Sequence, residues 1–145
     1  MKPMKLILPA LLVSGILIFS GCKKDDAPKV DPRDAFVGDY DIVFPCFNNF
    51  EDELEITKDA QDPNKIILNS EILEAWGAED LEATVTGTNF EIEDTDVQFT
   101  NPNDGITYTG ELSGDGELNG EELTMDVEFD LGPQSINCDV EGEKK

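Results

Sequence analysis

Carboxylates dominate the side chains of this sequence that could do chemistry. The 145-residue chain has 33 Asp and Glu against 10 Lys and Arg, and a net charge of −23. Two carboxyl groups held close together are the machinery of glycoside hydrolysis. Such pairs, two residues apart, occur at Asp39/Asp41, Glu91/Glu93 and Asp126/Glu128. We expect all of them on the solvated faces of strands, where they are poorly placed for acid–base catalysis. We therefore predict no catalytic residue, with a carboxylate-based hydrolase as a distant alternative.

The chain has no histidine, which excludes His-based triads, His general bases and the usual zinc and copper sites. Residues 115–126 approach the pattern of a calcium-binding EF-hand loop. They depart from it at Glu117 and Glu122 and in being flanked by predicted strands. We predict no metal ligands and no cofactor, and leave open a weak, nonspecific association of Ca²⁺ with the acidic surface.

Cys22 lies between an apolar segment and four charged residues. Residues 1–5 contain two lysines and residues 6–20 are almost entirely apolar. This is the pattern of a secretory signal peptide, and the segment is shorter than the roughly 20 apolar residues of a membrane span. An uncleaved signal anchor with an incidental cysteine is the alternative.

Ser20-Gly21-Cys22 resembles the lipobox of bacterial lipoproteins, with Phe19 where leucine is commoner. The resemblance implies a signal peptide over residues 1–21, cleavage before Cys22 and a lipid on its sulfur. Residues 23–26 (KKDD) resemble the surface-export signal of Bacteroidetes lipoproteins. That implies lipid anchoring in the outer membrane, facing the cell exterior; a generic charged linker is the alternative. Residues 22–34 are predicted to form a flexible tether.

Period-two alternation of apolar and acidic residues begins at Phe36 and continues to the end of the chain. This pattern predicts an all-β domain over residues 35–145, an antiparallel sheet of eight or nine strands with acidic outer faces. The parity changes between Ile92 and Val97, which predicts a bulge or turn at residues 94–96. Residues 70–80 are predicted to form about two turns of helix.

One hairpin is predicted in detail, with Gly110, Gly114 and Gly116 on its inward face. Asn119-Gly120 is the preferred pair for a two-residue turn, which would pair Leu118 with Glu121 and Gly116 with Leu123. A longer loop that pairs Leu118 with Leu123 is the rival register. Glycines on an inward face suit a small, tightly curved barrel.

Residues 35–141 resemble the lipocalin-like domains of small Bacteroidetes lipoproteins. The resemblance rests on FVGDYDI in the first strand, on the glycine-rich hairpin, and on Cys46 and Cys138 in the first and last strands. It implies an up-and-down β-barrel, in which the first and last strands are neighbours. Two inward cysteines there would form a disulfide that closes the seam, which export permits; two free buried thiols are the alternative.

Four bulky apolar residues of the connecting segments are the candidate contacts for a ligand or partner: Phe47, Phe50, Leu73 and Trp76. They would either surround an open mouth or plug the barrel, and the small size of the domain favours the plug. The acidic surface disfavours nucleic acid. We therefore expect a non-catalytic binding role, with another outer-membrane protein as partner. A small apolar ligand inside the barrel is the alternative.

Overall fold

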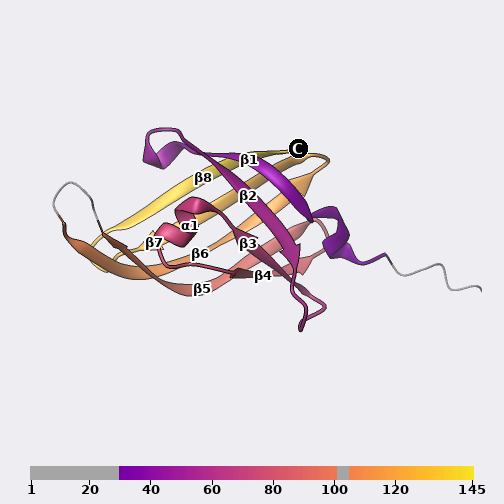
Figure 1. The fold of residues 1–145 in the computed structure, drawn as a ribbon, viewed down its shortest axis with the longest axis horizontal. Coiled ribbons are helices and arrows are strands. Elements are labelled where there is room, and N and C mark those ends of the chain that lie inside the picture. Colours follow the sequence, from indigo (N-terminus) through magenta and orange to yellow (C-terminus); the bar gives the residue numbers. More distant parts are fainter. Residues whose placement is uncertain (1–29, 101–104) are drawn as a thin grey trace, which may run out of the picture.

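The computed structural model describes residues 30–100 and 105–145. Eight antiparallel strands, each paired with the next, form one closed barrel (Figure 1). The strands are β1 (Gly38–Phe44), β2 (Phe50–Lys58), β3 (Lys65–Asn69), β4 (Leu81–Thr86), β5 (Asn89–Thr100), β6 (Thr107–Asn119), β7 (Glu122–Asp130) and β8 (Ser135–Lys144). Three short helices accompany them: η1 (Pro32–Ala35), η2 (Pro45–Phe47) and α1 (Glu71–Ala75). The prediction of an all-β, up-and-down barrel is confirmed.

The barrel closes where β1 pairs with β8, from Tyr40 opposite Lys144 to Val43 opposite Glu141. Figure 1 shows the indigo β1 lying beside the yellow β8, although the two strands are the first and last of the chain. Closure removes the unpaired backbone groups that the edge of an open sheet would expose.

Side chains alternate between core and solvent as the period-two pattern predicts. In β7 every second residue is buried, beginning with Leu123, and the residues between them are exposed. The predicted bulge is confirmed, because the β5–β6 register shifts between Ile92 and Thr95. The shift returns Val97, which is 5% exposed, to the interior.

The β6–β7 hairpin corrects the favoured register. Asn119 pairs with Glu122 and Leu118 with Leu123, so the turn residues are Gly120 and Glu121. The pairing of Leu118 with Glu121 is wrong, and the rival pairing of the two leucines is correct. A shift of two residues keeps the same side chains inside. It also lets Leu118 pack against an apolar partner and leaves Glu121 in solvent.

Gly116 is required by close packing inside the hairpin. A Cβ at this position would overlap the ring of Phe90, which is buried and reaches across from β5. The inward glycine therefore makes room for an aromatic side chain in a narrow barrel.

One end of the barrel is sealed by η1. The guanidinium Nη1 of Arg33 donates to the carbonyl oxygens of Asp59, Asp62 and Lys65 at 3.2, 2.9 and 3.3 Å, which ties η1 to the β2–β3 loop. Beside it, Phe36 is fully buried and meets Phe90 edge to face. The last residues assigned to the tether, 32–34, therefore lie in η1 against the barrel.

The middle of the barrel is filled by side chains. The void there has a volume of only about 10 Å³ and is lined by apolar residues of several strands together with Leu73 of α1. There is no room for a ligand at this level, so any internal site must lie toward the end opposite η1.

Candidate functional site

Helix α1 lies across the end of the barrel opposite η1. The Ser70 hydroxyl caps the helix by accepting a hydrogen bond from the Leu73 N–H at 3.3 Å. The Asp52 carboxylate of β2 accepts from the Ile72 N–H at 3.0 Å. At the other end of the helix the Trp76 carbonyl accepts from the Gln98 N–H of β5 at 2.8 Å. These bonds hold α1 between β2 and β5.

Helix η2 places two aromatic side chains at the same end. Asn48 and Asn49 follow it with φ of 61° and 56°, a left-handed conformation that asparagine adopts more readily than most residues. The turn returns the chain into β2, where Phe50 pairs with Phe44. Phe47 and Phe50 thus lie on either side of a tight reversal.

An apolar cavity of about 410 Å³ opens between these helices and the far ends of the long strands. We call it the mouth cavity. Its volume is within the range of small-molecule sites. It is lined by Phe47, Phe50, Ile72, Trp76, Val97, Phe99, Tyr108, Phe129, Leu131 and Ile136. None of these side chains carries a charge at neutral pH.

Aromatic rings form two walls of the mouth cavity. On one side, the centroid of the Trp76 ring lies 4.6 Å from that of Phe129 and 5.1 Å from that of Phe47. On the other, Phe99 of β5 and Tyr108 of β6 stack with their centroids 5.9 Å apart. Offset and edge-to-face ring contacts of this kind hold aromatic side chains in defined positions.

The structure separates the four predicted contact residues. Phe47, Phe50 and Trp76 line the mouth cavity, whereas Leu73 points into the filled core. Trp76 and Leu73 are 7% and 6% exposed, and Phe50 is 43% exposed. At this end of the barrel Leu73 therefore belongs to the filled core, Phe50 lies at the open rim, and Trp76 lies between them.

The cavity-lining residues of β5 to β8 were not predicted from the sequence as ligand contacts. Val97 and Phe99 follow the inward parity of β5 beyond the bulge, so their inward direction was predictable. The hollow was not, because it depends on strand lengths. β5 and β6 have 12 and 13 residues, whereas β3 and β4 have 5 and 6.

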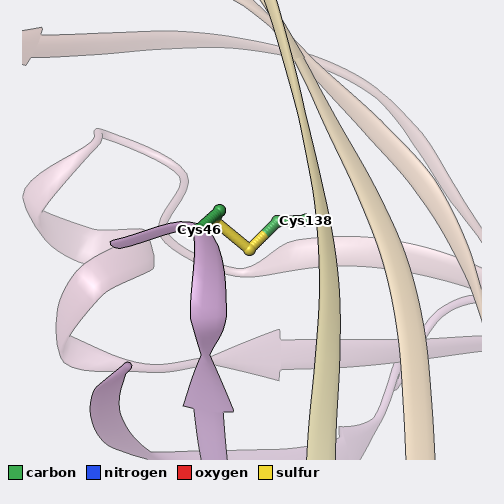
Figure 2. The surroundings of a disulfide bond; sticks show 2 residues. All are labelled: Cys46 and Cys138. Atoms are coloured by element: carbon green, nitrogen blue, oxygen red, sulfur yellow. A yellow bond between two sulfur atoms is a disulfide. The ribbon is translucent and has the colours of Figure 1, made fainter. Parts of the chain in front are cut away.

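The predicted disulfide joins Cys46 to Cys138, with their Cα atoms 5.4 Å apart. Figure 2 shows it linking the segment after β1 to β8. The last β1–β8 pair at this end joins Val43 to Glu141. Cys46 follows Val43 by three residues, and Cys138 precedes Glu141 by three residues. The bridge thus fixes the seam beyond its last paired residues, beside Phe47. The expectation that both cysteines point inward is wrong for Cys46, which is exposed at the end of the barrel, while Cys138 is buried.

Every Lys and Arg of the described residues lies away from the mouth cavity. Arg33 and Lys58 pair with Asp31 beside η1. Lys65 pairs with Glu82 and Glu93, and Lys145 pairs with Asp41 and Glu53. The Lys144 ammonium donates to the Ala35 carbonyl at 2.8 Å. The ion pairs with Glu82 and Glu93 raise the pKa of Lys65, and those with Glu53 and Asp41 raise the pKa of Lys145 to about 12.

The paired carboxylates considered for hydrolysis are all exposed on the outer face. Asp115, Asp126 and Asp139 lie directly opposite one another on β6, β7 and β8. Within residues 30–100 and 105–145, no group of three or more Asp, Glu, His or Cys side chains is arranged to hold a metal ion. The segment resembling a calcium loop forms the tight β6–β7 hairpin.

The described part of the chain contains no helix long and apolar enough to cross a membrane. Cys22, the signal peptide and the export signal lie outside the described residues. In comparisons with protein-family models, curated proteins and solved structures, nothing matched this chain. Its fold and site define a small up-and-down β-barrel that is sealed at one end and has an apolar mouth at the other.

Proposed function

We propose that this protein is a non-catalytic binding protein that holds a small apolar molecule in the mouth cavity. The observation that supports this proposal is the cavity itself, a hollow of about 410 Å³ with an uncharged, aromatic-rich lining. Moving apolar surface from water into such a site is favourable by roughly 25 cal/mol per Å². The filled middle of the barrel limits the ligand to the mouth, so it must be small.

A small ligand fits this geometry better than the protein partner that the sequence alone favours. Concave apolar sites bury most of the surface of a small molecule. The large exposed apolar residues of the described chain are Val30, Phe50 and Ile106, and only Phe50 lines the cavity. Docking of an outer-membrane protein therefore becomes the competing outcome of the tests below.

The proposed location is the outer membrane, with a lipid on Cys22 and the barrel held outside the cell by a short tether. This part rests on the residues FSGC and KKDD of the sequence. Cys22→Ser should abolish palmitate labelling and release the protein or leave it unprocessed. Unchanged labelling would reject the anchor.

Replacing Lys24, Asp25 and Asp26 by Ala should protect the barrel from protease added to intact cells, whereas equal cleavage would reject the export signal.

The binding proposal is tested by titrating the purified protein with 1-octanol, a small neutral apolar probe. Trp76 is the only tryptophan and lines the cavity, so its fluorescence reports occupancy of this site. We expect a saturable change in emission. No saturable change with octanol, together with a stable complex with another membrane protein in native mass spectrometry, would favour the docking role instead.

Two matched variants test whether octanol binds in the mouth cavity. Ile136→Phe adds bulk at the cavity wall, and Ile67→Phe adds the same bulk to β3 away from the cavity. Both isoleucines are half-buried strand residues. We expect octanol binding to weaken at least severalfold in the first variant and to be unchanged in the second. Equal affinity in the two variants would contradict binding in the mouth cavity.

A further inference from the structure

The charge distribution around the mouth cavity suggests what kind of ligand it accepts. We infer that the cavity prefers an apolar ligand with a cationic amine group to a matched ligand with a carboxylate group. This inference rests on the proposed binding function and specifies its ligand class.

The first supporting observation is that no positively charged side chain of residues 30–100 and 105–145 lines the site. The five described cations, Arg33, Lys58, Lys65, Lys144 and Lys145, make their contacts with η1, the β2–β3 loop and the outer faces of β1, β2, β4 and β5. None lines the mouth cavity. A ligand carboxylate held there would lose water without gaining a counter-charge, which is unfavourable.

The second observation is a row of acids on the outer side of the cavity wall. Asp96 on β5 lies opposite Glu111 on β6, and Glu111 lies opposite Asp130 on β7. Val97, Phe129 and Leu131 line the cavity. Asp96 directly precedes Val97, and Asp130 lies between Phe129 and Leu131. The field of these carboxylates attracts a cation at the mouth and repels an anion.

The third observation is the aromatic lining. Trp76, Phe47 and Phe129 line one side of the cavity and pack against one another. The negative face of an aromatic ring attracts an ammonium group when the two lie within about 6 Å. The lining and the acids behind it therefore favour the same ligand charge.

The test compares three eight-carbon probes, octylamine, 1-octanol and octanoate, at pH 7.5. At this pH the amine is protonated and the carboxylate is ionised. Affinities are measured from Trp76 fluorescence, with Ile136→Phe as the control for adsorption elsewhere on the acidic surface. We expect the order amine, alcohol, carboxylate. The affinities of amine and carboxylate should differ on the order of tenfold in 10 mM salt and less in 0.5 M salt, because salt screens exposed charges.

Two charge reversals on one strand separate the local field from total charge. Glu111→Lys changes the acidic row beside the mouth, and Glu117→Lys makes the same change toward the other end of β6. The two positions are six residues apart, about 20 Å along a strand, or roughly two Debye lengths at 0.1 M salt. In 0.1 M salt we expect Glu111→Lys to lower the amine-to-carboxylate affinity ratio severalfold and Glu117→Lys to change it less than about twofold.

The outcomes distinguish this inference from the function on which it rests. Failure of octanol to bind would overturn the proposed function. If octanol binds but octanoate binds as tightly as octylamine, the ligand preference is wrong while the binding function remains. An equal effect of Glu111→Lys and Glu117→Lys would also overturn the inference, because the preference would then come from overall charge.

Discussion

At the scale of single residues, the negative charge of Asp31 stabilises the end of the barrel that η1 seals. Its carboxylate accepts hydrogen bonds from the Arg33 side chain at 2.8 Å, from the Arg33 backbone at 3.0 Å and from Lys58 at 3.1 Å. These donors, the Arg33 side chain above all, hold the pKa of Asp31 well below its ordinary value. The ionised form is thus favoured in the folded protein.

The lowered pKa of Asp31 predicts how the stability of the protein depends on pH. A carboxyl group with a lowered folded pKa stabilises the protein above its unfolded pKa of about 4, and the contribution is lost as the pH falls through the folded pKa. Asp31→Asn keeps a good capping side chain but removes the charge. We expect it to lower the unfolding midpoint at pH 7 and the difference from the native protein to shrink below about pH 4. Thermal unfolding across this range measures it, with exposed Asp39→Asn as control. A difference that persists in strong acid would contradict this account.

Leu73 and Phe50 provide a second contrast between residues from the same end of the barrel. Leu73 is 6% exposed and contacts the filled core, whereas Phe50 is 43% exposed at the rim. Leu73→Ala should therefore cost about 2–5 kcal/mol of folding free energy, because it leaves a cavity. Phe50→Ala should cost about 1 kcal/mol or less and weaken octanol binding instead. Urea unfolding and probe titration of both variants check this, and the reverse pattern would mean that Phe50 is the core residue.

At the scale of strands, the acidic outer face carries an electrostatic penalty. Asp126 lies opposite Asp115 on one side and Asp139 on the other, so β7 brings two like-charge pairs together. Like charges directly opposite each other destabilise a sheet. Glu128, two residues along the same strand, lies opposite Ser113 and Asn137, which are neutral.

This difference predicts effects of different size on stability for two similar changes. Asp126→Asn should stabilise the barrel by about 0.5–1 kcal/mol at low salt, because it removes both repulsions. Glu128→Gln makes the same change of charge on the same face and should have a smaller effect. The advantage of Asp126→Asn should largely disappear in 1 M NaCl, where the Debye length is about 3 Å. Denaturant unfolding at both salt concentrations measures it; a gain that does not depend on salt would argue against charge repulsion.

Strand direction and parity were predictable because each depends on local alternation. The β5 bulge followed from the parity change between Ile92 and Val97. The β6–β7 register was not predicted correctly, since a shift of two residues leaves every side chain on its own face. The two registers differ in which residues lie opposite each other, as in the pairing of Leu118 with Leu123, and local pattern does not show that pairing.

At the scale of the whole molecule, the mouth cavity depends on relations between distant segments. Lys65–Asn69 and Leu81–Thr86 are short, and α1 lies between them in the chain, whereas β5 and β6 continue past the bulge. Trp76 reaches its position because its carbonyl accepts a hydrogen bond from Gln98. The sequence could therefore indicate that Phe47, Phe50 and Trp76 gather at strand ends. It could not indicate that a hollow would remain above Leu73.

The disulfide links β8 to the segment after β1, the two strands whose pairing closes the barrel, and removing it tests how much it stabilises the whole molecule. It joins residues 92 apart, and in the chain-entropy model a loop of that length stabilises the folded state by about 4–5 kcal/mol. Replacing Cys46 by Ser and Cys138 by Ala should lower the unfolding free energy by about 2–5 kcal/mol.

The loss should also have a definite location, because the two ends of the β1–β8 seam are held differently. Near Tyr40 the seam keeps the contacts of Lys144 with Ala35 and of Lys145 with Asp41, whereas near Val43 the bridge is the next link. Hydrogen exchange should therefore accelerate more in Val43 and Glu141 than in Tyr40 and Lys144. Octanol affinity should fall as well, since Phe47 directly follows Cys46 in η2 and lines the cavity. Uniform acceleration along the whole seam, with octanol affinity unchanged, would show that the bridge stabilises the barrel without positioning its mouth.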